Sequence, residues 1–150
     1  MRRCLGMRFI IHAGMEKTGT TSLQKFLYDN RDALLKELGV LYPLSYISGR
    51  AHYFYSSSYL RDFKKHFSTP DIRQVIDGLS LEIEKKEPEI VLISCEYMFQ
   101  NLYSDLKILL EMLKRKFKST EVDLVTYIRR QDDWIESMIK QAIKDPLVRA

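Results

Sequence analysis

The chain has 150 residues, of which 24 are Lys or Arg and 20 are Asp or Glu, so its formal net charge is +4. This length suits one domain, and no window approaches the roughly 20 apolar residues that a membrane-spanning helix requires. The two cysteines, Cys4 and Cys95, are too far apart in sequence to indicate a disulfide framework or a metal site. We therefore expect a cytoplasmic protein of a reducing compartment, with no metal, no nucleic-acid partner and no secretory signal before Arg8.

The first half of the chain predicts two strands and a long helix. An apolar strand over 9–13 is followed by a glycine-containing loop and by a helix over 20–38, which Gly39 ends. A short strand over 40–42 precedes an aromatic and hydroxyl-rich segment over 44–58. The helix carries an apolar stripe that we expect to face the core: Leu23, Phe26, Leu27, Leu34, Leu35 and Leu38.

The second half alternates helices and strands. We predict a short helix over 59–67, a helix capped at Thr69 with Pro70 in its first turn, a strand over 90–94, a helix over 106–117 and a strand over 122–128. The helix that opens at Pro70 has a predicted inner face of five residues: Ile72, Val75, Ile76, Leu79 and Ile83. A last helix follows, with an apolar face of Trp134, Ile135, Met138, Ile139 and Ala142. This alternation predicts a three-layer α/β/α fold with a parallel sheet, in which ligands bind at the carboxyl ends of the strands.

The loop after the first strand has the composition of an anion-binding cradle. Gly14 and Gly19 allow a sharp turn whose N–H groups converge, and the helix start adds unpaired donors and the positive end of a dipole. Lys17 supplies a mobile positive charge. Neutral donors come from four hydroxyls: Thr18, Thr20, Thr21 and Ser22.

The order of these residues differs from that of a Walker-type nucleotide loop. In such a loop the lysine directly follows the second glycine, and a hydroxyl next to it binds magnesium. Here Lys17 precedes Gly19, which argues against an ordinary ATPase or GTPase. A P-loop kinase-like enzyme with an unusual loop, or a non-catalytic phosphate- or nucleotide-binding module, remains an alternative interpretation.

The loop resembles the 5′-phosphosulfate loop of sulfotransferases that use 3′-phosphoadenosine 5′-phosphosulfate (PAPS), in particular bacterial-type and carbohydrate-directed members. A second motif agrees: Arg129 follows an apolar strand, and Ser137 stands eight positions later in a helix. In the family, an arginine and a serine at this spacing grip the 3′-phosphate of the nucleotide. The resemblance covers about 9–141 and implies a P-loop NTPase-like sulfotransferase core, PAPS as cofactor and a single domain over 1–150. Family members commonly continue with a closing Arg-Lys-Gly-type loop, so we expect the chain to correspond to a member without its C-terminal part.

The resemblance also implies roles for the cradle residues. Lys17 would stabilise charge on the leaving phosphate oxygen, while the glycines and hydroxyls after it would bind the 5′-phosphate and the sulfate. Arg130 is one position out of register, and a surface ion pair with Asp132 or Asp133 is the simpler interpretation.

The general base is left open between two residues. Glu96 occupies the place where cytosolic sulfotransferases carry a histidine, and a carboxylate is the base in some carbohydrate-directed members; alternatively it caps the helix that follows. His52 is the second candidate for the base. We interpret His12 as structural or as a support for the loop.

The acceptor is predicted only by class, as a hydroxyl or amine of a carbohydrate, another glycan or a small molecule. The segment over 44–58 is either a lid that binds this acceptor or an irregular segment packed on the core. The oligomeric state is not determined by these patterns.

Overall fold

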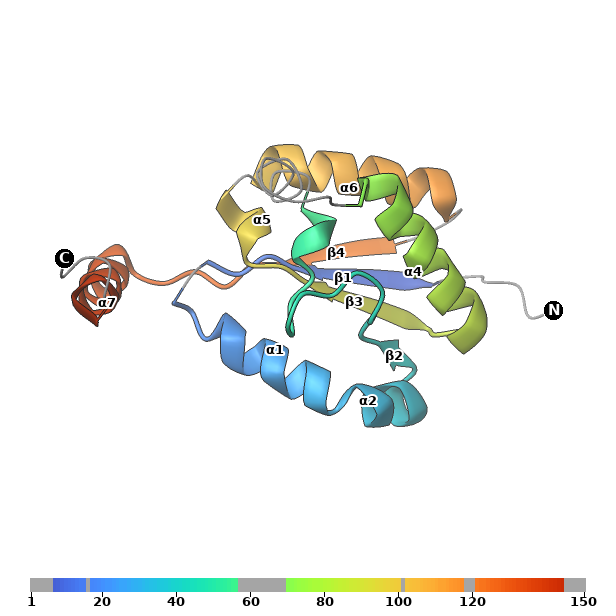
Figure 1. Cartoon of the computed structure of the whole chain (residues 1–150), viewed down its shortest axis with the longest axis horizontal. Helices are drawn as coiled ribbons and strands as arrows, with labels where there is room; N and C mark the ends of the chain where they lie inside the picture. The colour runs from blue at the N-terminus through green and yellow to red at the C-terminus, as the bar shows by residue number, and fades with distance from the viewer. Residues whose placement is uncertain (1–6, 16, 57–69, 101, 118–120, 145–150) are drawn as a thin grey trace.

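The computed structural model describes residues 7–15, 17–56, 70–100, 102–117 and 121–144. Its sheet has four parallel strands in the order β2-β3-β1-β4: β1 Arg8–His12, β2 Val40–Leu41, β3 Ile90–Ser94 and β4 Glu121–Val125. β1 lies between β3 and β4, and His12 pairs with Ser94 on one side and with Val125 on the other. All strands therefore end at the same edge (Figure 1).

Helices cover both faces of this sheet (Figure 1). α1 (Thr20–Asp29) and α2 (Arg31–Leu38) lie on one face, and α4 (Ile72–Lys86) and α6 (Leu102–Lys116) lie on the other. The short α5 (Tyr97–Gln100) and the 3₁₀ helix η1 (Tyr53–Tyr55) lie beside the end of β3. This arrangement confirms the predicted three-layer α/β fold with a parallel sheet.

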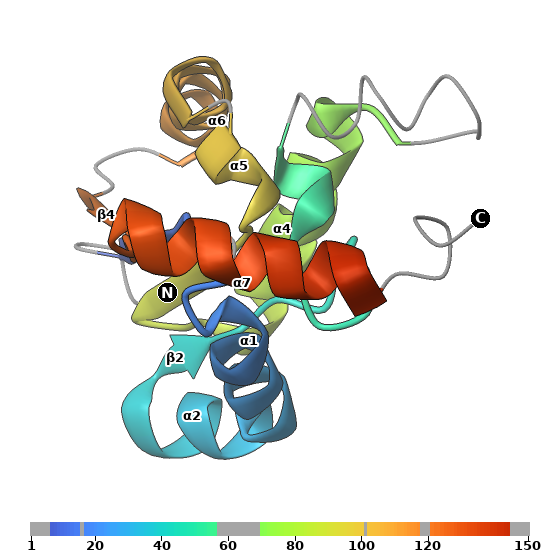
Figure 2. The ribbon, with the colours of Figure 1, turned by 90° about the vertical axis from the view of Figure 1, so that its left-hand side faces the viewer.

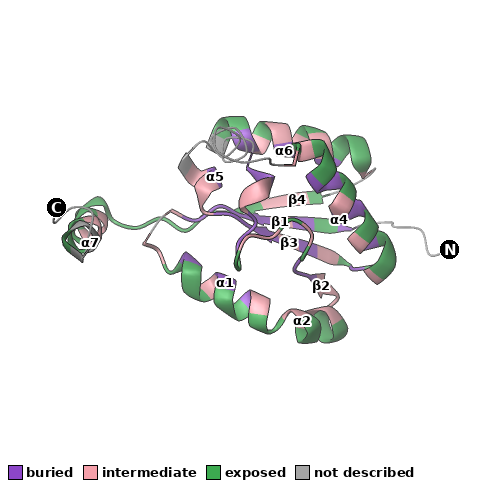
Figure 3. Ribbon diagram, viewed as in Figure 1, coloured by how far each residue is buried: buried purple, intermediate pink, exposed green. Residues whose placement is uncertain are grey.

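The hydrophobic core lies between the sheet and the pair α4 and α6. Phe9 and Ile11 of β1 are fully buried on this side, and the Phe9 ring packs at 5.4 Å from that of Phe117. The inner face predicted for α4 is confirmed at four of its five positions, which are buried: Val75, Ile76, Leu79 and Ile83. Figure 3 shows that the exposed residues lie mainly on the outer faces of the helices.

The predicted helix over 20–38 is interrupted at Asn30. The backbone and side-chain amides of Asn30 both donate to the Phe26 carbonyl, at 3.0 and 2.8 Å, and α2 restarts at the next residue. Because the break turns the following residues, one stripe does not face the core along the whole length. Leu27 is buried, whereas Phe26 and Leu38 are 56% and 61% exposed, so the prediction was wrong for these two.

Other predicted boundaries also differ. Asp71 caps α4, since its carboxylate accepts from the Arg73 amide while Gln74 reaches back to the Asp71 amide, and Pro70 therefore precedes the helix. β4 ends at Val125 instead of Ile128. The predicted helix over 59–67 and the predicted cap Thr69 lie outside the described residues.

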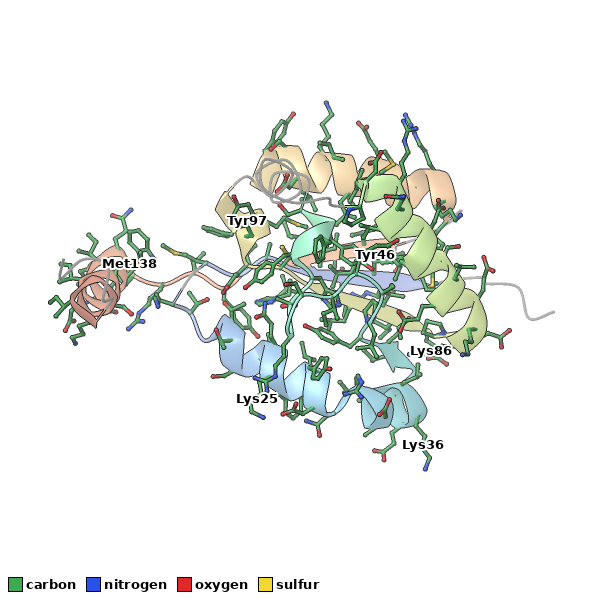
Figure 4. The ribbon with its side chains drawn as sticks, viewed as in Figure 1. Lys25, Lys36, Tyr46, Lys86, Tyr97 and Met138 are labelled. Carbon is green, nitrogen blue, oxygen red and sulfur yellow. The ribbon has the colours of Figure 1, made fainter. Side chains whose placement is uncertain are left out.

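The last helix, α7 (Gln131–Lys144), lies beyond the carboxyl ends of the strands, apart from the two helical layers (Figures 1 and 2). Ile135 and Ile139, predicted for its inner face, are 51% and 55% exposed, while Trp134 and Met138 are half-buried. Figure 4 shows Met138 on this outlying helix. Because α7 lies at the edge of the sheet, it has only a limited surface against which its side chains can be buried.

The segment between β2 and η1 is packed on the core. The fully buried His52 ring accepts the Ser94 amide at Nδ1 (3.0 Å) and contacts the Pro43 carbonyl through Nε2 (2.9 Å). The Glu82 carboxylate of α4 accepts hydrogen bonds from the amides of Leu44 and Ser45, and the shortest N···O distance is 3.0 Å for each amide. These bonds favour the packed interpretation of the described part of this segment, 44–56.

No helix in the described ranges combines the length and the apolar character needed to cross a bilayer.

The buried His52 makes stability depend on pH. Burial lowers the pKa of His52 from 6.5 to about 4, so as the pH falls through this interval the unfolded chain binds a proton that the folded protein does not. The free energy of unfolding should therefore fall with acidification between pH 6.5 and 4, by about 3 kcal/mol in total from this group. Urea titrations at a series of pH values measure this loss.

The matched variant is His52→Asn, whose carboxamide oxygen retains an acceptor for the Ser94 amide. We expect it to be less stable than the wild type at neutral pH but with a shallower dependence of stability on pH. Parallel curves for the two proteins across this interval would contradict the assignment.

Candidate functional site

The two sequence motifs meet because hydrogen bonds between β1 and β4 continue beyond the strands. The amide of Ala13 donates to the carbonyl of Val125, and that of Met15 donates to the carbonyl of Tyr127, each at 2.9 Å. Two residues further along each chain segment, Arg129 Nη1 donates to the Lys17 carbonyl at 2.9 Å. The structure therefore brings Arg129 directly against the glycine-containing loop.

The loop is held in shape by its own hydroxyls. Thr18 Oγ1 donates to the Met15 carbonyl at 2.5 Å, and Thr20 Oγ1 lies 3.4 Å from the same oxygen. Lys17 and Gly19 both adopt the left-handed backbone conformation, with φ of 65° and 86°. For a lysine this conformation costs roughly 1–2 kcal/mol, and such strain is typical of functional sites.

Several backbone donors of the loop are free. Within the described part of the chain, the amides of residues 17–21 donate to no acceptor. Gly19 is the N-cap of α1 and supplies no capping side chain, and the first turn carries no acidic residue. An anion at this position would receive these N–H groups together with the positive end of the helix dipole.

An open cavity of about 530 Å³ lies beside the loop. Among the described residues that line it, the charged ones are two cations, Lys17 and Arg129, and the others are Thr18, Thr126, Tyr127 and Ile128. Residues 126–128 were not among the predicted site residues. Their position directly before Arg129, at the carboxyl end of a strand, could have identified them as site residues.

The predicted hydroxyl donors differ in their placement. Thr20 is buried at 2% exposure with its hydroxyl turned into the loop, whereas Thr21 and Ser22 are exposed in the first turn of α1. Thr20 thus shapes the loop from within, and Thr21 and Ser22 remain accessible from solvent.

Ser137 is half-buried on α7, which crosses the carboxyl edge of the sheet (Figure 2). The pKa of its neighbour Glu136 is lowered mainly by the hydrogen bond from Lys140, and the positive charge of Arg129 contributes in the same direction. α7 starts two residues after Arg129, which contacts the Lys17 carbonyl of the loop. Among the described residues, Ser137 makes no side-chain hydrogen bond to Arg129 or to the loop.

The Arg130 side chain is directed to the first turn of α7 and away from the cavity. Its guanidinium makes two hydrogen bonds to the carboxylate of Asp132, at 2.7 and 2.6 Å, and lies 3.8 Å from Asp133. The predicted ion pair of Arg130 is therefore confirmed.

Glu96 lies just past the end of β3, next to the strand that carries the loop. Its half-buried carboxylate accepts a hydrogen bond from the Tyr53 hydroxyl at 2.9 Å, and α5 begins at the next residue, Tyr97, labelled in Figure 4. Tyr53 belongs to the aromatic segment that was predicted as either a lid or a packed segment. Only the tertiary structure brings it to Glu96, from 43 positions away in sequence.

His52, the other candidate base, is unsuited to proton transfer in this geometry. It is fully buried, both ring nitrogens are within hydrogen-bond distance of backbone groups, and its lowered pKa favours the neutral ring. We therefore assign His52 a structural role.

Scans against protein-family models, curated proteins and solved structures found no match. The described residues also contain no group of three or more His, Cys, Asp or Glu side chains arranged to hold a metal ion.

Alanine substitutions at two glycines with left-handed backbones test whether the loop binds an anion. Gly19 (φ 86°) and Gly49 (φ 61°) both have open space where a Cβ would be added. Alanine at either position should therefore lower the free energy of unfolding by about 1–2 kcal/mol through backbone strain alone. Only Gly19→Ala should also weaken phosphate binding, because only Gly19 belongs to the loop.

Thermal denaturation with and without phosphate measures both effects, and Gly49→Ala is the control. Equal protection of the two variants by phosphate would show that the loop is not the binding site.

Proposed function

We propose that the protein is a PAPS-dependent sulfotransferase, which transfers a sulfuryl group to a hydroxyl or amine acceptor. The observation that carries this proposal is the contact of Arg129 with the Lys17 loop at the edge of the shared cavity. A nucleotide with phosphate groups at both its 5′ and its 3′ positions needs two cationic binding points. The loop and Arg129 supply two such points from segments 112 positions apart.

The loop residues fit the 5′ end of such a nucleotide. The amides of 17–21, which have no acceptor among the described residues, and the start of α1, which has no capping side chain, form a set of donors suited to phosphate and sulfate oxygens. Lys17 adds a positive charge at the mouth of the cavity. Arg129 is the candidate for the 3′-phosphate, for which a guanidinium can give two parallel hydrogen bonds.

The nucleotide supplies an activated sulfuryl group, and the protein supplies charge, position and a base. The acceptor oxygen or nitrogen forms a bond to sulfur while the bond from sulfur to the 5′-phosphate oxygen breaks. Lys17 stabilises the negative charge that develops on that leaving oxygen. Glu96 takes the acceptor proton, and Tyr53 orients its carboxylate.

The acceptor would enter between the loop and the end of β3, where the Tyr53 hydroxyl donates a hydrogen bond to Glu96. Tyr97 follows Glu96 in the chain, and Tyr53, Phe54 and Tyr97 are half-buried against the core. A partly exposed aromatic surface beside a carboxylate is typical of sites that bind sugar rings. This supports a carbohydrate or another hydroxyl-rich acceptor.

Titration calorimetry with the desulfated nucleotide, followed by a sulfate-transfer assay on a panel of glycans, tests the proposal. Binding with transfer supports it, and binding without transfer supports the alternative of a non-catalytic module. Absence of binding, or turnover of ATP with magnesium, contradicts it.

Replacement of Lys17 should impair turnover more than binding. Charge on the leaving oxygen is greatest in the transition state, so Lys17→Ala should lower kcat by about 100-fold or more while raising the Kd of the desulfated nucleotide by less than about 10-fold. Lys25→Ala is the matched control, since Lys25 is an exposed lysine of α1 that pairs with Asp29. Equal losses in kcat and affinity would remove the catalytic role of Lys17.

Replacement of Arg129 should change nucleotide selectivity. Loss of a charge-assisted contact should weaken binding of the nucleotide with a 3′-phosphate by about 10- to 100-fold. Binding of the nucleotide without a 3′-phosphate should be weakened far less. Arg130→Ala removes a neighbouring guanidinium that is already paired with Asp132 and should leave the selectivity unchanged. Calorimetry with the two nucleotides measures both; an unaltered preference in Arg129→Ala would contradict the assignment.

A further inference from the structure

His12, the last residue of β1, is buried at the point where the three segments of the site meet. Its side chain is 2% exposed, and its Nδ1 lies 2.9 Å from Ser94 Oγ at the end of β3. Its ring also makes an edge contact with the Tyr127 ring, with 4.8 Å between centroids, two residues before Arg129. One side chain thus contacts both the end of β3 and the segment that follows β4.

The opposite edge of the ring faces the loop itself. A Cβ added at Gly14 would lie 2.9 Å from His12 Nε2 and 3.0 Å from Thr20 Oγ1. Both are closer than ordinary van der Waals contact, so the imidazole and the Thr20 hydroxyl occupy the space that a side chain at position 14 would need. This close approach explains why residue 14 must be a glycine.

Ser94 and Gln24 hold the ring from the side of Nδ1. Gln24 Nε2, in α1, lies 3.3 Å from Ser94 Oγ, which in turn lies 2.9 Å from His12 Nδ1. Among the described residues Nε2 has no hydrogen-bond partner, and burial lowers the pKa of His12, which favours the neutral ring.

We propose that His12 is the positioning residue of the anion site, and that its Nε2 edge sets the approach of Gly14 and Thr20 on which the loop conformation depends. Ser94 and Gln24 fix the ring orientation, and Tyr127 relates it to the segment that carries Arg129. The identity of the ligand rests on the proposed function, whereas the arrangement of these side chains does not.

Two variants test the roles of the two edges of the His12 ring separately. In His12→Asn the shorter carboxamide keeps a partner for Ser94 but leaves a void beneath Gly14. In His12→Gln the longer carboxamide reaches the Nε2 position and loses the Nδ1 contact. If the Nε2 edge positions the loop, Gln preserves the loop and Asn does not; an imidazole that only anchors β3 gives the reverse order.

The first measurement uses nuclear magnetic resonance of the ligand-free protein. We expect the imidazole nitrogen shifts of wild-type His12 to report a neutral ring at neutral pH. The amide resonances of Gly14, Thr20 and Arg129 should move in His12→Asn and lie close to their wild-type positions in His12→Gln. Unmoved resonances in His12→Asn would overturn the inference.

The second measurement is calorimetric titration with the desulfated nucleotide. We expect its Kd to rise by about 10-fold or more in His12→Asn and by less than about 3-fold in His12→Gln, with equal affinities overturning the inference. A wild type that binds no desulfated nucleotide contradicts the proposed function, and the resonances then decide the role of His12. If His12→Asn does not fold, Ser94→Ala replaces it: unmoved amide resonances of Gly14 and Thr20 in that variant would overturn the inference.

Discussion

The continuation of the β1–β4 hydrogen bonds past the end of the strands is the constraint on which the site depends. The amides of Ala13 and Met15 pair with carbonyls of 125 and 127, so the two segments advance side by side after the regular strands end. This shared register brings the Lys17 carbonyl to the guanidinium of Arg129. A shift of the register would separate the cationic groups, because successive residues of an extended segment face opposite sides.

The loop combines backbone strain with unsatisfied donors. Lys17 keeps a left-handed backbone, and the amides of 17–21 have no acceptor within the described residues. Neither feature favours folding, and both are what an anion site needs, since donors that the protein has already bonded cannot bind a ligand. The compensating stability comes from the core between the sheet and the pair α4 and α6, where Phe9, Ile11 and Leu79 are fully buried.

Histidines on either side of β3 serve different purposes. His52 is fully enclosed and connects the segment after β2 to the end of β3, through the Pro43 carbonyl and the Ser94 amide. His12 is joined to the side chain of the same serine but leaves one nitrogen facing the loop. Ser94 thus links a purely structural histidine with one that we infer to position the site. Glu96 lies two residues further on, so the arrangement of β3 also orients the proposed base.

Local patterns in the sequence determined the parallel α/β architecture, the strand β3, the inner face of α4 and the two motifs at strand ends. Hydrophobic periodicity and glycine spacing are properties of neighbouring residues, and they can be read without the fold. The interruption at Asn30, the exposure of Ile135 and the burial of His52 could not be predicted, because each depends on how distant segments pack. The contacts of Arg129 with Lys17 and of Tyr53 with Glu96 likewise required the tertiary structure, since sheet register and chain crossovers alone bring such separated residues together.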